Sequence, residues 1–239
     1  MDKVYESPSP QFKSFRDILV ENCLIKYPNH DFLGKITLKV TKVNDEEVEE
    51  REVTKFKYRE VFHLAENVGS FVINNEMDFP GVEFDMKLIG IFAKNRYEWM
   101  VADIACCLYG LTLVPLYDTL GVENLSYCLN NSGITTCFCT AETVNTLLKL
   151  KDHGNLKNII SLDPLTKETE MKLNDLKFKI FYFQEAMQKP QKVVDYRKFH
   201  VHQESMLTFS YTSGTTGPPK GAMLSHGNFL AFLAAFLNH

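Results

Sequence analysis

The chain has 239 residues, of which 45% are hydrophobic and 23% are charged, and its formal net charge is −4. This length and composition suit one large globular domain or two small ones. Lysines and arginines are scattered, and no basic face is interleaved with aromatic residues, so the sequence predicts no nucleic-acid partner. The first residues lack the basic head and apolar core of a secretory signal, which predicts a cytoplasmic protein. The six cysteines match neither zinc-binding nor disulfide spacing, and most are expected to be buried.

Two elements are predicted near the N-terminus. Hydrophobic residues recur at helical spacing in residues 14–26, which predicts a first helix. Alternation of apolar and polar residues within 36–40 predicts a peripheral hairpin over residues 36–57. The acidic run Asp45–Glu50 is expected to be a solvated loop of this hairpin, and a partner-binding acidic patch is the alternative.

After the hairpin, apolar runs separated by turn residues predict helices and strands in alternation. Such alternation predicts an α/β fold, with mostly parallel sheets flanked by helices. The polar stretch Asp163–Asp175 lacks periodicity and is expected to be irregular. In a parallel sheet, ligands bind beyond the carboxyl ends of the strands. The predicted strands cover residues 87–92, 111–117, 134–138, 157–161, 178–183 and 206–209, and the predicted helices cover residues 59–74, 97–109, 122–131, 142–151 and 229–237.

The longest apolar run, residues 99–117, approaches the length of a membrane span. Asp103, Gly110 and Pro115 interrupt it, however, and a span rarely carries such residues together. The run is therefore expected to form a helix that ends at Gly110, followed by a buried strand.

A polar stretch, Ser210–Gly221, follows the apolar run Met206–Phe209 and reads Ser-Tyr-Thr-Ser-Gly-Thr-Thr-Gly-Pro-Pro-Lys-Gly. Glycines let the main chain turn several N–H groups toward one point, hydroxyl groups add donors, and a lysine adds positive charge. The stretch therefore predicts an anion-binding loop suited to a triphosphate, and an exposed linker is the alternative. The candidate binding residues are Thr212, Ser213, Gly214, Thr215, Thr216, Gly217 and Lys220.

Two kinds of phosphate loop must be separated. A Walker A loop needs serine or threonine directly after its lysine, at the start of a helix. Here Pro219 precedes Lys220 and Gly221 follows it, which argues against a P-loop phosphotransferase. The stretch resembles instead the Tyr-Thr-Ser-Gly-Thr-Thr-Gly-x-Pro-Lys-Gly motif of the adenylate-forming (AMP-binding) superfamily. Three further segments resemble the N-terminal half of long-chain fatty acid CoA ligases: Leu33-Gly34, Gly90–Trp99 and Val114–Gly121.

This resemblance implies a two-step ligase reaction. A fatty acid carboxylate attacks the α-phosphate of ATP to give an acyl-adenylate and pyrophosphate, and the thiol of CoA then displaces AMP. By the same resemblance, residues 213–217 wrap the β- and γ-phosphates, Thr212 lies close to phosphate and magnesium, and Lys220 offsets the pyrophosphate charge. Thr212 and Lys220 are thus the catalytic candidates, Thr212 is the metal candidate, and ATP, Mg²⁺ and CoA are expected. A medium-chain or aryl acid as substrate, or a non-catalytic nucleotide-binding relative, are the alternatives.

The resemblance also implies that residues 1–239 are the N-terminal portion of a large adenylate-forming domain. The family's magnesium-binding glutamate, ribose-binding aspartate, hinge and C-terminal catalytic lysine belong to motifs that do not occur before His239. The chain alone is therefore expected to have little ligase activity and to need the missing C-terminal portion as a partner. The apolar segment Phe229–Leu237, capped by Ser225, needs another surface to bury it. His226 is expected in the first turn, where a capping-turn position is favoured over a catalytic one.

Lipid substrates suggest a place on the cytosolic face of endoplasmic reticulum or peroxisome membranes, with peripheral contact.

Overall fold

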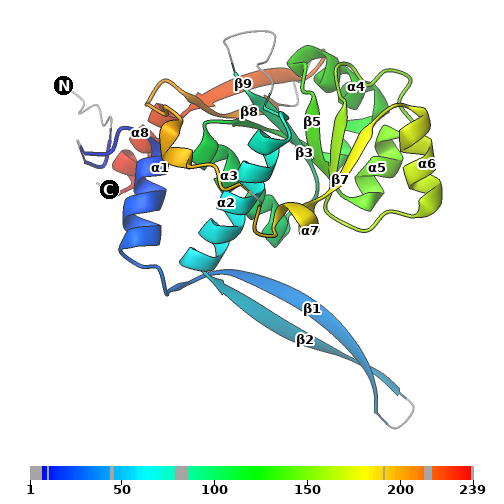
Figure 1. Cartoon of the computed structure of the whole chain (residues 1–239), viewed down its shortest axis with the longest axis horizontal. Helices are drawn as coiled ribbons and strands as arrows, with labels where there is room; N and C mark the ends of the chain where they lie inside the picture. Colours follow the sequence, from blue (N-terminus) through cyan, green and yellow to red (C-terminus); the bar gives the residue numbers. More distant parts are fainter. Residues whose placement is uncertain are drawn as a thin grey trace.

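The computed structural model describes residues 7–9, 11–43, 46–78, 86–190, 192–212 and 217–237. Within these residues, seven strands form one sheet in the order β7-β6-β5-β3-β4-β8-β9 (Figure 1). Neighbouring strands from β7 to β8 are parallel, whereas β9 at the edge runs antiparallel to β8. The prediction of a mostly parallel α/β fold is therefore confirmed. The strands are β3 (Leu88–Phe92), β4 (Thr112–Leu116), β5 (Thr136–Cys139), β6 (Asn158–Ser161), β7 (Lys179–Tyr182), β8 (Met206–Thr212) and β9 (Lys220–Ser225).

Helices cover both faces of this sheet (Figure 1). In β3, Ile89 and Ile91 join the core beneath α2 and α3, whereas Leu88 and Phe92 join the core beneath α4, α5 and α6. A parallel sheet that is buried on both faces has nearly continuous apolar strands, which is why the sequence revealed them. The helices are α1 (Phe15–Ile18), the π-helix η1 (Leu19–Ile25), α2 (Tyr58–Asn74), α3 (Tyr97–Tyr109), η2 (Asp118–Leu120), α4 (Gly121–Ser132), α5 (Ala141–Leu147), α6 (Lys167–Asp175), α7 (Phe183–Ala186), η3 (Tyr196–Lys198) and α8 (His226–Leu237).

The predicted first helix is present, but only its first turn is α-helical, and it continues as the π-helix η1. Ser14 caps it, because its hydroxyl accepts from the Asp17 amide at 3.2 Å while Asp17 accepts from the Ser14 amide at 2.8 Å. Arg16 Nη1 donates to the Leu108 carbonyl at 3.0 Å and to the Phe199 carbonyl at 2.9 Å. These bonds hold α1 at the C-terminal end of α3, where a cation is favoured.

A hairpin is present where the sequence predicts one, but it begins at residue 31 rather than 36. Its strands, β1 (Asp31–Val43) and β2 (Glu46–Lys57), pair only with each other among the described strands and project from the remainder (Figure 1). The expectation that the acidic run would be a loop is wrong, because residues 46–50 belong to β2. Lys39 on β1 pairs with Glu52 on β2 at 2.5 Å, so charge on β2 supports strand pairing. The exposed apolar residues of one hairpin face are Ile36, Leu38, Val40 and Val53, which are 64%, 55%, 59% and 54% exposed.

The sequence suggested that the stretch Asp163–Asp175 is irregular. This prediction is wrong, because α6 occupies most of the stretch. The Thr166 hydroxyl caps this helix by accepting from the Thr169 amide at 3.2 Å. Leu173 is its only buried residue. A helix that buries a single side chain has no apolar periodicity, so the pattern could not indicate it.

Helix α8 begins after β9, and the prediction that Ser225 caps it is confirmed, since the Ser225 hydroxyl accepts from the Asn228 amide at 3.2 Å. The rings of Phe229 and Phe15 lie 5.5 Å apart, so α8 packs beside α1. The side of α8 that continues from Phe229 is left largely uncovered by the described residues: Phe232, Phe236 and Leu237 are 65%, 71% and 69% exposed. No helix in the described part of the chain is long and apolar enough to cross a membrane.

Candidate active site at the carboxyl edge of the sheet

The polar motif connects β8 and β9 at the carboxyl end of β8. Its boundaries differ from the expected loop 210–221, because β8 continues through Thr212 and β9 already begins at Lys220. Thr212 and Lys220 are direct cross-strand partners, and the Thr212 hydroxyl donates to the Lys220 carbonyl at 3.2 Å. Both residues are exposed. The two catalytic candidates therefore stand side by side where the loop leaves the sheet and returns to it.

Four candidate residues of the loop, Ser213, Gly214, Thr215 and Thr216, lie outside the described residues. Gly217 is described, and its φ of +98° is one that residues with a side chain rarely adopt. The loop therefore returns toward β9 through a backbone conformation that favours glycine at this position.

Gly221, which follows Lys220, has a different structural reason. A Cβ atom placed there would lie 2.2 Å from the ring of Phe209 on the neighbouring strand. The ring of Phe209 thus packs against the bare main chain of β9. This contact fixes β9, and with it Lys220, against β8.

Tyr211 anchors the start of the loop, and sequence reasoning did not assign it this role. It is only 3% exposed, and its hydroxyl donates to Asn131 Oδ1 at 2.8 Å and to the Cys128 carbonyl at 3.1 Å. Both partners belong to α4. Because Tyr211 directly precedes Thr212, these bonds tie the loop entrance to α4.

Two cavities flank the loop. The first, here called the Thr212 cavity, has a volume of 480 Å³ and lies between the loop ends and the residues that follow β4. Its lining consists of Tyr117, Thr119, Leu120, Asn124, Tyr211, Thr212, Gly217 and Pro219. The second cavity, of 540 Å³, includes Lys220 together with Asn130, Asn131 and Phe209. The described ends of the loop thus contribute to both hollows, and so does α4.

The α4 residues beside the loop carried a signal that sequence reasoning missed. Asn124, Tyr127 and Asn131 are spaced by three and four residues, so they share one face of the helix. This face lines the two cavities rather than the core. Polar residues at helical spacing directly after a buried strand were the available indication.

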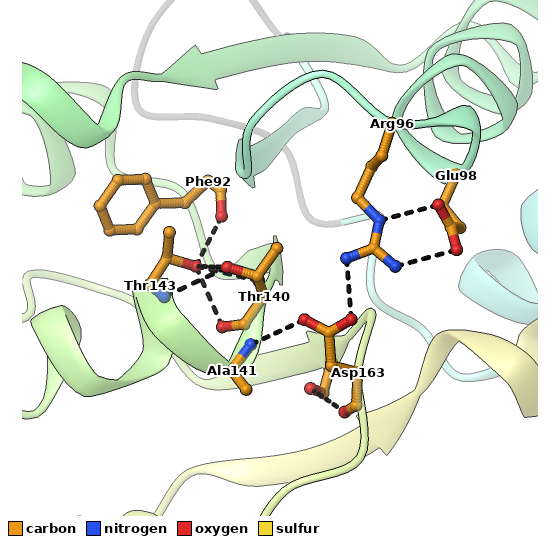
Figure 2. A network of polar contacts seen from close by, with 8 residues as sticks. Phe92, Arg96, Glu98, Thr140, Ala141, Thr143 and Asp163 are labelled. Atoms are coloured by element: carbon orange, nitrogen blue, oxygen red, sulfur yellow. Dashed lines mark hydrogen bonds and ion pairs between the residues drawn. The ribbon is translucent and has the colours of Figure 1, made fainter. Parts of the chain in front are cut away.

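A network of polar contacts braces neighbouring strand ends at the same edge of the sheet (Figure 2). Arg96 donates from Nε and Nη2 to Glu98 at 2.7 and 2.9 Å and from Nη1 to Asp163 at 2.8 Å. Asp163 also accepts from the Ala141 amide at 3.0 Å. The hydrogen bonds that Arg96 donates to Glu98 and Asp163 raise the pKa of Arg96 above its usual range, which keeps the guanidinium charged. The network joins the segments that follow β3, β5 and β6.

One further charged group lies near this edge. Lys94 follows β3 and approaches Glu142 at 3.4 Å and Asp118 at 3.5 Å. The coulombic effect of Glu142, followed by that of Asp118, raises the pKa of Lys94. All three groups are solvent-exposed, so this cluster is weakly held.

Within the described residues, no group of three His, Cys, Asp or Glu side chains could hold a metal ion. Five cysteines are buried, as predicted, and burial raises the pKa of Cys106, Cys107, Cys128 and Cys139. His226 is buried at the start of α8, where burial lowers its pKa to about 4. It lines neither cavity beside the loop, in agreement with the expected capping-turn position.

The arrangement has the chemical properties of a site for a phosphorylated ligand. Thr212 and Lys220 are paired across β8 and β9 beyond the carboxyl ends of parallel strands, with Thr212 in the lining of one cavity and Lys220 in that of the other. The surrounding edge is held by buried and half-buried polar contacts, which limits its movement. This fold, with a lysine at the end of a strand-connecting loop on that edge, is typical of the class of α/β enzymes that bind phosphorylated ligands.

The family described as AMP-binding enzyme matches residues 38–239, and the chain belongs to it. Among solved structures, the adenylation and carrier didomain of carboxylic acid reductase from Segniliparus rugosus, in complex with AMP, superposes with a TM-score of 0.69 at 18% identity. That alignment covers 92% of this chain and 33% of the reductase chain. It confirms the fold expected from the resemblance, that of the adenylate-forming domain.

Curated relatives are ligases of fatty acids. Long-chain-fatty-acid–CoA ligase 6 of Homo sapiens is 35% identical over 191 residues, which cover 75% of this chain and 26% of the ligase. Fatty acyl-CoA synthetase B of Dictyostelium discoideum is 37% identical over 152 residues, which cover 62% of this chain and 22% of the synthetase. The chain thus spans about a quarter of the length of these relatives, and its similarity lies in the N-terminal region of long-chain fatty acid CoA ligases.

Proposed function

We propose that the chain is the portion of a long-chain fatty acid CoA ligase that binds the phosphates of the nucleotide. Such a ligase converts a fatty acid, ATP and CoA into acyl-CoA, AMP and pyrophosphate. The observation that carries this proposal is the cross-strand pair of Thr212 and Lys220 at the ends of the motif loop. The similarity to fatty acid CoA ligases supports the substrate class.

The charge on the two substrates explains why hydroxyl groups, glycines and a lysine are needed in this loop. The carboxylate and ATP are both anionic, so the site must neutralise phosphate charge before the acid oxygen can attack the α-phosphate. The main chain of residues 213–217 would surround the β- and γ-phosphates, and Lys220 would balance the charge of the departing pyrophosphate. Tyr211 would hold the loop entrance against α4 while the charge develops.

Magnesium would act by screening the phosphates and orienting them. The described lining of the Thr212 cavity includes no carboxylate, so the ion would be held mainly by phosphate oxygens. Thr212 would supply the hydroxyl nearest to it, after releasing its hydrogen bond to the Lys220 carbonyl. This donor set fits a hard cation that keeps several waters.

The chain on its own would have little or no ligase activity. It spans about a quarter of the length of its relatives. The adenine, ribose and CoA contacts would then belong to sequence outside these residues. The partner would be the C-terminal portion of the same enzyme. Lipid chemistry would place the whole enzyme at the cytosolic side of endoplasmic reticulum or peroxisome membranes.

The direct test is equilibrium binding of ATP with Mg²⁺ to the chain and to Lys220→Ala. The variant should bind at least about tenfold more weakly, which corresponds to about 1.4 kcal/mol. Lys151→Ala, which removes an exposed lysine outside the lining of both cavities, is the matched control and should bind like the wild type. Equal binding by all three proteins would contradict the proposed role of the loop.

Substrate class is tested separately. A chimera in which this chain replaces the matching quarter of human long-chain-fatty-acid–CoA ligase 6 should catalyse acid-dependent exchange of pyrophosphate into ATP. We expect oleate to support this exchange better than a medium-chain or an aryl acid. Sustained acyl-CoA production by the 239-residue chain alone would refute the expectation that it is inactive by itself.

A further inference from the structure

A third cavity, here called the Asp103 cavity, lies between α1, α3, α8 and the sheet and has a volume of 600 Å³. Its walls are chiefly apolar, and it is separate from the two hollows beside the motif loop except for Tyr117, which it shares with the Thr212 cavity. The aromatic residues of its wall are Phe15, Phe32, Trp99, Tyr117 and Phe229.

One carboxylate faces this apolar space. Asp103 on α3 is half-buried, and within the described part of the chain its side chain has no hydrogen bond or ion pair. Burial raises the pKa of Asp103 from 3.8 to about 6, and no neighbouring cation opposes that effect. The other titratable groups of the lining are Cys107 and Tyr117, and its described members include no lysine, arginine or histidine. A desolvated carboxylate is costly without a cation, so the cavity lacks a positive charge.

The apolar surface does not end at the cavity. Leu224 and Phe229 belong to the lining, and Phe229 also begins the uncovered side of α8. There the rings of Phe232 and Phe236 stack at 6.4 Å, and both are largely exposed. A contiguous apolar surface of this kind is typical of an interface with another polypeptide. An enclosed site for a small molecule would need no flat helix face beside it.

We infer that the Asp103 cavity and the uncovered side of α8 form one docking surface for a polypeptide segment that inserts a lysine or arginine side chain beside Asp103. The cation would pair with the carboxylate and lie near the Trp99 ring, while apolar side chains of the segment cover Phe232 and Phe236. The segment belongs to the part of a long-chain acyl-CoA ligase beyond the matched quarter, and this identity rests on the proposed function. About three quarters of the length of these relatives lies outside the region matched here. The segment would come from that part.

The charge complementarity is tested on the 239-residue chain, whose only tryptophan, Trp99, reports directly on the cavity. Phenylbutylamine mimics a cationic side chain on an apolar stem, and phenylbutanol is its neutral counterpart. At about pH 7.5 the amine should bind at least about tenfold more tightly than the alcohol, as read from Trp99 fluorescence. Asp103→Asn should abolish this preference, whereas Asp175→Asn, an exposed aspartate on α6, should retain it. Equal affinity of the wild type for amine and alcohol would overturn the inference.

The occupant is tested in the chimera with human long-chain-fatty-acid–CoA ligase 6, using labelled phenylbutylamine and equilibrium dialysis. If the ligase fills the cavity, the amine no longer binds in an Asp103-dependent way. Should the chimera not fold, the downstream part of the ligase is co-expressed as a separate polypeptide and the same measurement is made on the co-purified pair. Undiminished binding to a folded chimera would overturn the inference and assign the cavity to a small cationic ligand.

The two proposals can fail independently. Lys220→Ala in the chimera should abolish acid-dependent exchange but leave the exclusion of the amine unchanged. Exclusion without exchange activity would therefore retain the docking surface and reject the ligase function. Exchange activity without exclusion of the amine would retain the ligase function and reject the docking surface.

Discussion

The hydroxyl of Tyr211, at the last position before the loop-flanking Thr212, donates to the side-chain oxygen of Asn131 at 2.8 Å. The same hydroxyl donates to the Cys128 carbonyl at 3.1 Å, so one phenol holds the end of β8 against the last turns of α4. This connection joins the motif loop to a helix that begins after a different strand. Movement of the loop entrance therefore requires either breaking these bonds or moving α4.

The first prediction concerns this anchor. Tyr211→Phe keeps the ring and removes both hydrogen bonds, so we expect the free energy of unfolding to fall by about 1 to 2 kcal/mol. Affinity for ATP should fall as well, because the loop entrance is no longer fixed. Tyr27→Phe, outside the lining of both cavities beside the loop, is the control and should change stability little because its ring is exposed. Urea unfolding and ATP titration measure the two effects. Equal losses of stability and affinity in the two variants would show that the Tyr211 hydroxyl does not anchor the loop entrance.

A second prediction follows from the contact between Gly221 and Phe209. Gly221→Ala places a methyl group 2.2 Å from the Phe209 ring, which should destabilise the fold by about 1 to 3 kcal/mol. Gly34→Ala on the hairpin meets its nearest neighbour at 3.5 Å and should be close to neutral. The double variant Phe209→Leu with Gly221→Ala should recover part of the loss. Absence of any recovery would show that the glycine is needed for another reason.

The Arg96 network supplies a third prediction. Arg96→Ala leaves Glu98, which is 7% exposed, without its bidentate partner. We expect a loss of about 2 kcal/mol, less than for a fully buried pair because Arg96 retains access to water. Arg197→Ala breaks an exposed pair with Asp195 and should have no measurable effect. Chemical unfolding of both variants decides the point, and a similar result for the two would mean that the network at the sheet edge adds no stability.

A fourth prediction concerns pH. The pKa of Asp103 in the folded chain, about 6, is above its ordinary value of 3.8, so the folded state binds this proton more tightly than the unfolded state. Below the ordinary value both states are protonated and the carboxyl costs nothing, whereas above about pH 6 the folded state carries a desolvated charge. Wild type should therefore lose stability relative to Asp103→Asn between about pH 4 and about pH 6, reaching on the order of 3 kcal/mol.

Unfolding of wild type, Asp103→Asn and Asp175→Asn across this pH range measures the difference. The Asp175 control should follow the wild type, because it removes an exposed carboxylate. A constant gap between wild type and Asp103→Asn at every pH would mean that the carboxylate is not desolvated in the folded chain.

The sequence was sufficient for the parallel sheet because strands such as β3 and β4 are buried on both faces and read as short apolar runs between turns. Gly110 marked the end of α3, where its φ is +66°. Helix α6 was missed because Leu173 is its only buried side chain, and the acidic run was misplaced because residues 46–50 pair along β1 within β2 although charge alone suggested a loop. The π-helical turn of η1 has no signature that separates it from an α-helix at this length.

The candidate site was predicted as a run of residues, and the run did contain the pair Thr212 and Lys220 that the strands bring together. Its surroundings could not be predicted in the same way. Tyr211 is 80 residues from Asn131 along the chain, and Arg96 is 67 residues from Asp163. Only the strand order brings each pair into contact. Single-sequence patterns report local periodicity, so they do not contain these pairings.

Strand β8 enters the sheet beside β4, and Thr208 donates to the Leu113 carbonyl across a separation of 95 residues. Such distant pairing is slow to form, and during synthesis it has to wait until the later strand has left the ribosome. The block from β3 to β7 can therefore assemble first, with its edge at β4 temporarily open. The loop and its lysine follow β8, so a nascent chain acquires its candidate site only after the block from β3 to β7 can have formed, rather than growing around it.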